Sequence, residues 1–169
     1  PTRVKKLREG LYDAILLAKA GTERLDLDLS DLHVEKLSPK EFVPAPAQGV
    51  LAWQIREADR DLEKIIEKLN NEEVASLIAV ERKVLNLFDG GCQLPLGVYC
   101  EADTDANEKR IFKVWVSKAK AWNEQPVQLY FEAPFTHELP EKIVEKINSI
   151  KPQKVFVTKT FREHDYLPK

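Results

Sequence analysis

The sequence of 169 residues has no methionine and only two cysteines. So few cysteines argue against a disulfide-rich protein and against a metal site built from cysteines. Cys92 and Cys100 are flanked by no metal-ligand pattern and do not build a disulfide framework, so we expect a reduced, cytoplasmic chain. The three histidines, His33, His137 and His164, are not spaced like metal ligands, and we expect no metal. No apolar run approaches the roughly 18 residues of a membrane span, so we expect no membrane contact.

A large excess of either charge is also missing, because the sequence has 26 basic and 28 acidic residues and a net charge of −2. A nucleic-acid surface needs a clustered positive excess, so we expect no nucleic-acid partner. The apolar share of 43% is enough for a core in one domain or in two small ones. The chain opens at Pro1 without an initiator methionine, which leads us to expect a fragment of a longer protein.

The pattern of apolar and turn residues predicts an α+β fold. Three alternating segments separated by polar breaks predict a three-stranded antiparallel sheet, over residues 94–102, 110–118 and 126–132. Apolar stripes predict helices that cover one face of this sheet, over residues 59–69, 70–88 and 140–150. Shorter elements predict a partial α/β segment upstream, with helices at 2–9 and 20–25 and strands at 14–18 and 48–56. A last strand is expected at 155–158.

Two features of the helix expected over 70–88 lead to specific predictions. Asn70 is expected to cap its N-terminus, with Glu73 three residues later completing a capping box. Glu81 falls on the apolar stripe of the same helix, where an unpaired carboxylate is costly to bury. We therefore expect Glu81 to form a structural ion pair with a nearby arginine.

The most informative stretch follows this helix and reads Asp89-Gly90-Gly91-Cys92-Gln93-Leu94-Pro95-Leu96-Gly97. Its glycines clear side chains from the approach to the Cys92 sulfur, and Pro95 cannot continue the helix. A chain that displays a thiol for covalent chemistry would have this form. Two alternatives stay open: a self-contained enzyme in which a histidine activates Cys92, and a non-catalytic α+β interaction domain in which Cys92 is merely packed.

Three ordered blocks of the sequence resemble the porphobilinogen deaminases, also called hydroxymethylbilane synthases. The blocks are the run from Pro1 to Leu25 with Thr2-Arg3 and Tyr12-Asp13-Ala14-Ile15-Leu16-Leu17-Ala18, the segment Pro44-Ala45-Pro46-Ala47-Gln48-Gly49-Val50-Leu51-Ala52, and the loop at 89–97. Their order and spacing match the family, which makes them more specific than one short motif. The resemblance implies a C-terminal fragment in three parts. Residues 1–57 would be a remnant of domains 2 and 1, residues 58–158 the C-terminal domain, and residues 159–169 a tail or the start of a fused domain.

The resemblance further implies a transferase that joins porphobilinogen units, with loss of ammonia, into hydroxymethylbilane. Cys92 would carry a covalent dipyrromethane cofactor beside Gly91 and Arg3, and Gln48 and Gly49 would bind the substrate. Arginine suits these anionic pyrroles because its guanidinium binds carboxylates bidentately and stays charged. The family's catalytic aspartate has no counterpart here. We therefore expect no catalytic residue in this chain, and no activity without the missing N-terminal domains.

Two more expectations concern the ends of the chain. The stretch Lys154-Val155-Phe156-Val157-Thr158-Lys159 is faintly similar to the opening strand of uroporphyrinogen-III synthase, and a plain last strand is the alternative. Residues 12–18 and 48–56 would normally pair in sheets whose other strands are absent. Unpaired strand edges favour association with other chains. We therefore expect one of three outcomes: a dimer of the chain, strand exchange, or rearrangement of residues 1–57.

Overall fold

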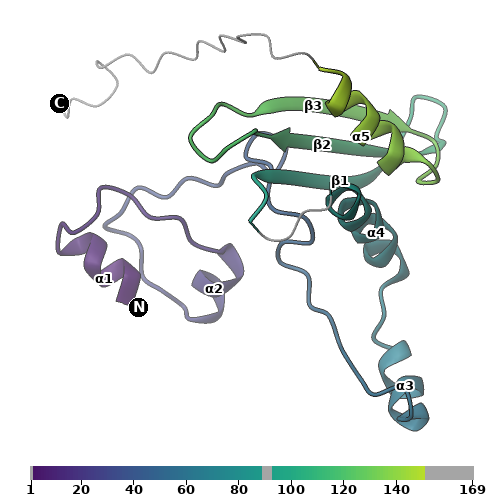
Figure 1. The fold of residues 1–169 in the computed structure, drawn as a ribbon. Coiled ribbons are helices and arrows are strands. Elements are labelled where there is room, and N and C mark those ends of the chain that lie inside the picture. The colour runs from purple at the N-terminus through teal and green to yellow at the C-terminus, as the bar shows by residue number, and fades with distance from the viewer. Residues whose placement is uncertain (1, 89–92, 151–169) are drawn as a thin grey trace. The chain divides into compact units, whose positions relative to one another are not determined.

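The computed structural model describes residues 2–88 and 93–150, which fall into two compact units, Pro1–Leu37 and Ser38–Lys169. The first unit contains two short helices, α1 (Thr2–Arg8) and α2 (Lys19–Arg24) (Figure 1). The second unit contains the other elements, α3 (Arg60–Glu67), α4 (Glu72–Leu87), β1 (Leu96–Thr104), β2 (Arg110–Lys118), β3 (Val127–Ala133) and α5 (Leu139–Ser149). Domain boundaries after residues 57 and 158 stay predictions.

The second unit is built on the three-stranded antiparallel sheet that the sequence predicts, in the order β1-β2-β3. The register places Val98 opposite Val116, and Val114 opposite Phe131. Since side chains alternate between the two faces of a strand, these apolar residues share one face of the sheet. Helices α4 and α5 cover this face, which confirms the predicted α+β fold (Figure 1).

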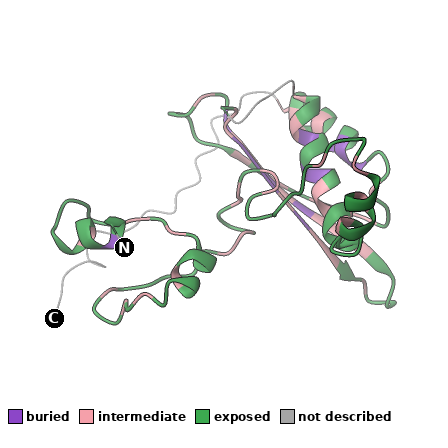
Figure 2. Ribbon diagram, turned by 90° about the horizontal axis from the view of Figure 1, so that it is seen from below, coloured by how far each residue is buried: buried purple, intermediate pink, exposed green. Residues whose placement is uncertain are grey.

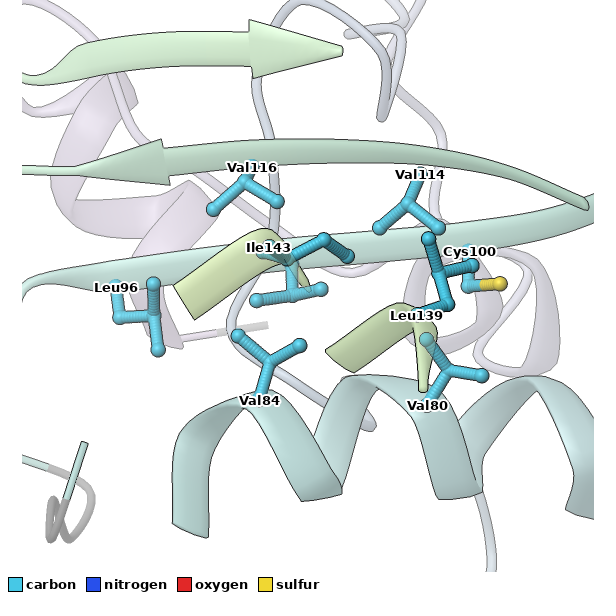
Figure 3. Close-up of a cluster of buried hydrophobic side chains, with 9 residues drawn as sticks. Val80, Val84, Leu96, Cys100, Val114, Val116, Leu139 and Ile143 are labelled. Atoms are coloured by element: carbon cyan, nitrogen blue, oxygen red, sulfur yellow. The ribbon is translucent and has the colours of Figure 1, made fainter. Parts of the chain in front are cut away.

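The hydrophobic core lies between this face of the sheet and the two helices (Figure 3). Val84 of α4, Val98 of β1, Val114 of β2 and Ile143 of α5 have no exposed surface. β-Branched side chains are favoured on a pleated surface that is covered, which accounts for the valines in the strands. Four elements thus meet in one core, and most of the stability of the second unit comes from there.

The opposite face of the sheet carries a row of aromatic side chains, one from each strand. The ring centroids of Tyr99 and Trp115 lie 5.9 Å apart, and those of Trp115 and Tyr130 lie 4.9 Å apart. Lys40 places its Nζ 4.8 Å from the centre of the Trp115 ring and 2.6 Å from a carboxylate oxygen of Glu101. The segment before α3 therefore contacts this face.

Helix α4 begins one residue later than expected. The side chain of Asn71, not Asn70, accepts a hydrogen bond from the Val74 N–H at 3.0 Å. Asn71 has the extended backbone that an N-cap residue needs, with φ −102° and ψ 100°. The prediction that Asn70 is the cap was wrong, because asparagine is a good N-cap residue at either position and the sequence does not distinguish the two.

The strands predicted at 14–18 and 48–56 are wrong, because neither segment has strand structure. A strand needs partners for its backbone hydrogen bonds, and the described residues supply none to these segments. Leu16 is 60% exposed, and Leu51 and Trp53 are 75% and 66% exposed. The upstream part is therefore loops and short helices rather than a partial α/β segment, and its surface is mostly exposed (Figure 2).

Helix α3 forms close to its predicted position, but it has no buried residue. Leu62 and Ile65, which belong to its apolar face, are exposed. The strand predicted at 155–158 lies outside the described residues. Among the helices that the structure describes, none has the length and apolar character needed to cross a membrane.

Gly97, at the start of β1, packs against the backbone of the segment before α3. A Cβ atom at this position would lie 2.5 Å from the Val43 carbonyl oxygen and 3.1 Å from that of Pro44. We expect Gly97→Ala to lower the free energy of unfolding by about 1–3 kcal/mol, because backbone must shift to relieve the overlap. Gly21→Ala is the control, since nothing lies within 4 Å of its Cβ position in α2. Thermal unfolding of the two variants checks this, and equal melting temperatures would contradict it.

Candidate functional site

The five site residues predicted from the sequence fall in different parts of the chain. Arg3 lies on α1 in the first unit and is exposed. Gln48 and Gly49 are also exposed and belong to the second unit. Gly91 and Cys92 lie outside the described residues, so their predicted roles stay predictions. The alternative of a histidine-activated Cys92 stays a prediction for the same reason.

Gln48 and Gly49 lie in two overlapping turns. The Gln48 N–H donates to the Ala45 carbonyl at 3.0 Å, and the Val50 N–H donates to the Ala47 carbonyl at 3.2 Å. The third residue of each turn has a positive φ, 63° at Ala47 and 83° at Gly49. Such a φ at the third position is the signature of a type II turn, and glycine adopts it at no steric cost. We call residues 45–50 the double turn.

The carboxylate of Glu81 anchors the double turn to the core. One oxygen, Oε2, accepts the Ala47 N–H at 2.7 Å, and the other, Oε1, accepts the Cys100 N–H of β1 at 2.9 Å. Glu81 is 4% exposed. The prediction of an ion pair with arginine was wrong: two backbone N–H groups satisfy the carboxylate instead.

Burial raises the pKa of the Glu81 carboxyl above its ordinary value, because the charged form loses its hydration. The hydrogen bonds from Ala47 and Cys100 favour the charged form and offset part of this rise in pKa. Sequence reasoning found Glu81 through its place on an apolar stripe. It could not find the donors, because both are backbone groups of distant segments.

The outer edge of β1 is covered by the same segment. The Val98 N–H donates to the Pro44 carbonyl at 2.9 Å, and the Cys100 N–H donates to Glu81. Alternate N–H groups of a strand point to the same side, so these two bonds use one edge of β1. The double turn is therefore held next to the strand that directly follows the cysteine loop in sequence.

Arg3 and Arg8 of α1 differ in how far their guanidinium groups are already engaged. Arg8 forms a bidentate pair with Asp31, with Nε and Nη2 at 2.8 and 2.6 Å from the two carboxylate oxygens. Arg3 makes one long contact, from Nη1 to the Leu16 carbonyl at 3.5 Å. Of these two arginines, Arg3 thus has more donors left for an anion, which fits its predicted role.

The exposed groups at the predicted positions in each unit include hydrogen-bond donors. Arg3 offers a guanidinium for a carboxylate, while Gln48 offers a side-chain amide and Gly49 a backbone without a side chain. These donors suit a ligand that bears carboxylates.

Cys100, the second cysteine, is unsuited to covalent chemistry. Its side chain is part of the core and 4% exposed. Burial, with a smaller contribution from the charge of Glu81, raises the pKa of the Cys100 thiol to about 12. The thiolate is the reactive form of cysteine, so Cys100 is inert in the folded chain.

We expect Cys100 to resist alkylation by iodoacetamide at pH 8 until the second unit unfolds. The raised pKa leaves almost no thiolate at this pH, and the core blocks access of the reagent to the sulfur. Peptide mass mapping after native labelling, with a sample labelled in urea as control, measures this. Labelling of Cys100 at the same rate in both samples would contradict it.

Comparison with known proteins gives the same family for the part of the chain that contains Arg3, Gln48 and Gly49. Residues 1–64 match the family model described as porphobilinogen deaminase, dipyromethane cofactor binding domain. The porphobilinogen deaminase of Fusobacterium nucleatum is 44% identical over 104 residues, which are 62% of this chain and 34% of that protein. A probable porphobilinogen deaminase of Methanocella arvoryzae is 49% identical over 98 residues, which are 58% of this chain and 31% of that protein.

These matches are confined to part of the chain and to part of each relative. The matched part of the chain is similar to the porphobilinogen deaminases. The chain spans about a third of the length of the curated relatives that it matches.

Proposed function

We propose that this chain is part of a cytoplasmic hydroxymethylbilane synthase, which condenses porphobilinogen units with loss of ammonia. The observation that carries this proposal is the match of residues 1–64 to the deaminase family model, together with relatives that are 40–49% identical. The exposed donors of the double turn and of Arg3 support it, since they suit anionic pyrroles.

In this proposal Cys92 holds a dipyrromethane through a thioether. A soft, nucleophilic sulfur is suited to bond an electron-poor carbon, and a thioether is stable once formed. The bound dipyrromethane supplies the pyrrole end to which further units are added. Cys100 does not compete for this role, because its thiol is buried and its pKa is raised.

The chain's own residues bind and orient anionic groups in this proposal. The guanidinium of Arg3 pairs with a carboxylate of the cofactor, and the amides of Gln48 and Gly49 donate to the substrate pyrrole. The catalytic aspartate of the family comes from the part of the enzyme upstream of these residues. The chain therefore needs those domains to act, and it makes no hydroxymethylbilane by itself.

The experiment compares the 169-residue chain with the full-length enzyme that contains it, each supplied with porphobilinogen. We expect hydroxymethylbilane from the full-length enzyme and none from the isolated chain. Product from the isolated chain would contradict the prediction that the chain lacks the catalytic aspartate. Absence of product from the folded full-length enzyme would contradict the proposed function.

A further inference from the structure

Glu81 is the one charged residue buried in the described part of the chain, and the proposed chemistry does not use it. It lies on α4 between core positions, one residue after Val80 and one turn before Val84. A carboxylate at such a position costs stability unless its hydrogen bonds are complete. A fully apolar residue would pack there at lower cost, so the contacts of this side chain need a reason.

The two oxygens of Glu81 serve two segments that are far apart in the sequence. Oε1 accepts the N–H of Cys100 on β1, and Oε2 accepts the N–H of Ala47 in the double turn. A carboxylate can accept at both oxygens at once, which no other side chain of this size can do without offering a donor. The side chain thus bridges the sheet and the turn through one rigid group.

The bridge holds the residue of the double turn that most needs support. Ala47 has a φ of 63°, a conformation that alanine adopts only where its surroundings hold it. The bond from its N–H to Glu81 lies at this residue, and Gln48 and Gly49 follow directly. The second anchor of the segment, the bond from the Val98 N–H to the Pro44 carbonyl, lies just before the double turn.

We propose that Glu81 is a positioning residue, whose carboxylate fixes the double turn against β1 and so sets the direction in which Gln48 and Gly49 present their amides to a pyrrole carboxylate or ring. The part of this inference that concerns pyrroles rests on the proposed function. The part that concerns the turn rests on the contacts alone.

Glu81→Gln is the informative variant because it keeps the size of the side chain and removes one acceptor. Glutamine has one carbonyl oxygen, so its NH₂ group must face either the Ala47 N–H or the Cys100 N–H. Val84→Ala is the control, because it weakens the same helix in the core and leaves both Glu81 bonds in place.

The first measurement is the ¹⁵N NMR spectrum of the full 169-residue chain. We expect Glu81→Gln to move the amide signals of Ala47, Gln48 and Gly49, because the acceptor loses its charge. We also expect hydrogen exchange to become at least about tenfold faster at Ala47 or at Cys100, whichever N–H faces the NH₂ group and loses its hydrogen bond. Val84→Ala should leave these three signals in place. Unchanged signals in folded Glu81→Gln would overturn the proposal.

A measurement on the unsubstituted chain decides the case in which Glu81→Gln fails to fold. We expect the amide proton shifts of Ala47 and Cys100 to change with pH at the same midpoint as the chemical shift of the Glu81 side-chain carboxyl carbon. Amide proton shifts with a different midpoint from that of the Glu81 carbon would overturn the proposal that the Glu81 carboxylate accepts hydrogen bonds from both N–H groups.

The second comparison uses the full-length enzyme and separates the two parts of the inference. We expect Glu81→Gln to raise KM for porphobilinogen about tenfold, equivalent to the loss of one well-placed contact, while Val84→Ala leaves KM unchanged. An unchanged KM would overturn the role toward pyrroles. If the unsubstituted enzyme makes no product, the proposed function fails, and the NMR result alone decides the role of Glu81 in the turn.

Discussion

Substitution of Cys92 by alanine in the full-length enzyme is expected to abolish hydroxymethylbilane synthesis. Under the proposed function the Cys92 sulfur is the covalent tether of the dipyrromethane, and a methyl group cannot form that bond. The expected effect is a loss of product to below detection, measured by its absorbance after conversion to porphyrin.

Cys100→Ala is the matched control for this substitution. Cys100 is a buried core residue with a raised pKa, so its loss affects packing and leaves the tether intact. We expect the Cys100→Ala enzyme to be somewhat less stable and to retain synthesis. Full synthesis by Cys92→Ala would rule out the tether, and loss of synthesis in both folded variants would remove the distinction between the two thiols.

Ile143→Ala is expected to be among the most destabilising single substitutions in the second unit. Ile143 lies on α5 with no exposed surface, where α4, α5 and the sheet meet. Removing three carbons there leaves a cavity, and such changes cost about 2–5 kcal/mol. Urea unfolding followed by circular dichroism measures the loss as a lower midpoint at an unchanged slope.

Ile65→Ala is the control for the same chemical change at an exposed site. Ile65 lies on α3 and is 59% exposed, so we expect its substitution to change the free energy of unfolding by about 0.5 kcal/mol or less. Equal losses for Ile143→Ala and Ile65→Ala would contradict the position of the core between α4, α5 and the sheet.

The elements of the second unit could be predicted because their signals are local. Alternating apolar residues such as Val114 and Val116 predict a strand, and the stripe through Leu77 and Val84 predicts a helix, in agreement with β2 and α4. The strands expected at 14–18 and 48–56 failed for the opposite reason. Their apolar runs are typical of buried strands, but pairing depends on partners that the local sequence does not contain.

The candidate site shows the same limit. Gln48 and Gly49 were found through a resemblance to a family, and the structure adds that they occupy exposed double-turn positions. Glu81 was noticed as a carboxylate on an apolar stripe, yet its partners proved to be the backbone of Ala47 and Cys100. Backbone donors carry no residue signature, so only the fold can identify them.

The most direct test of the central claim is peptide mass mapping of the full-length enzyme purified without denaturation. The account predicts that the peptide containing Cys92 is heavier than its sequence by the mass of a dipyrromethane, while the peptide containing Cys100 has its sequence mass. An active enzyme in which the Cys92 peptide has the mass of the bare sequence would contradict the account.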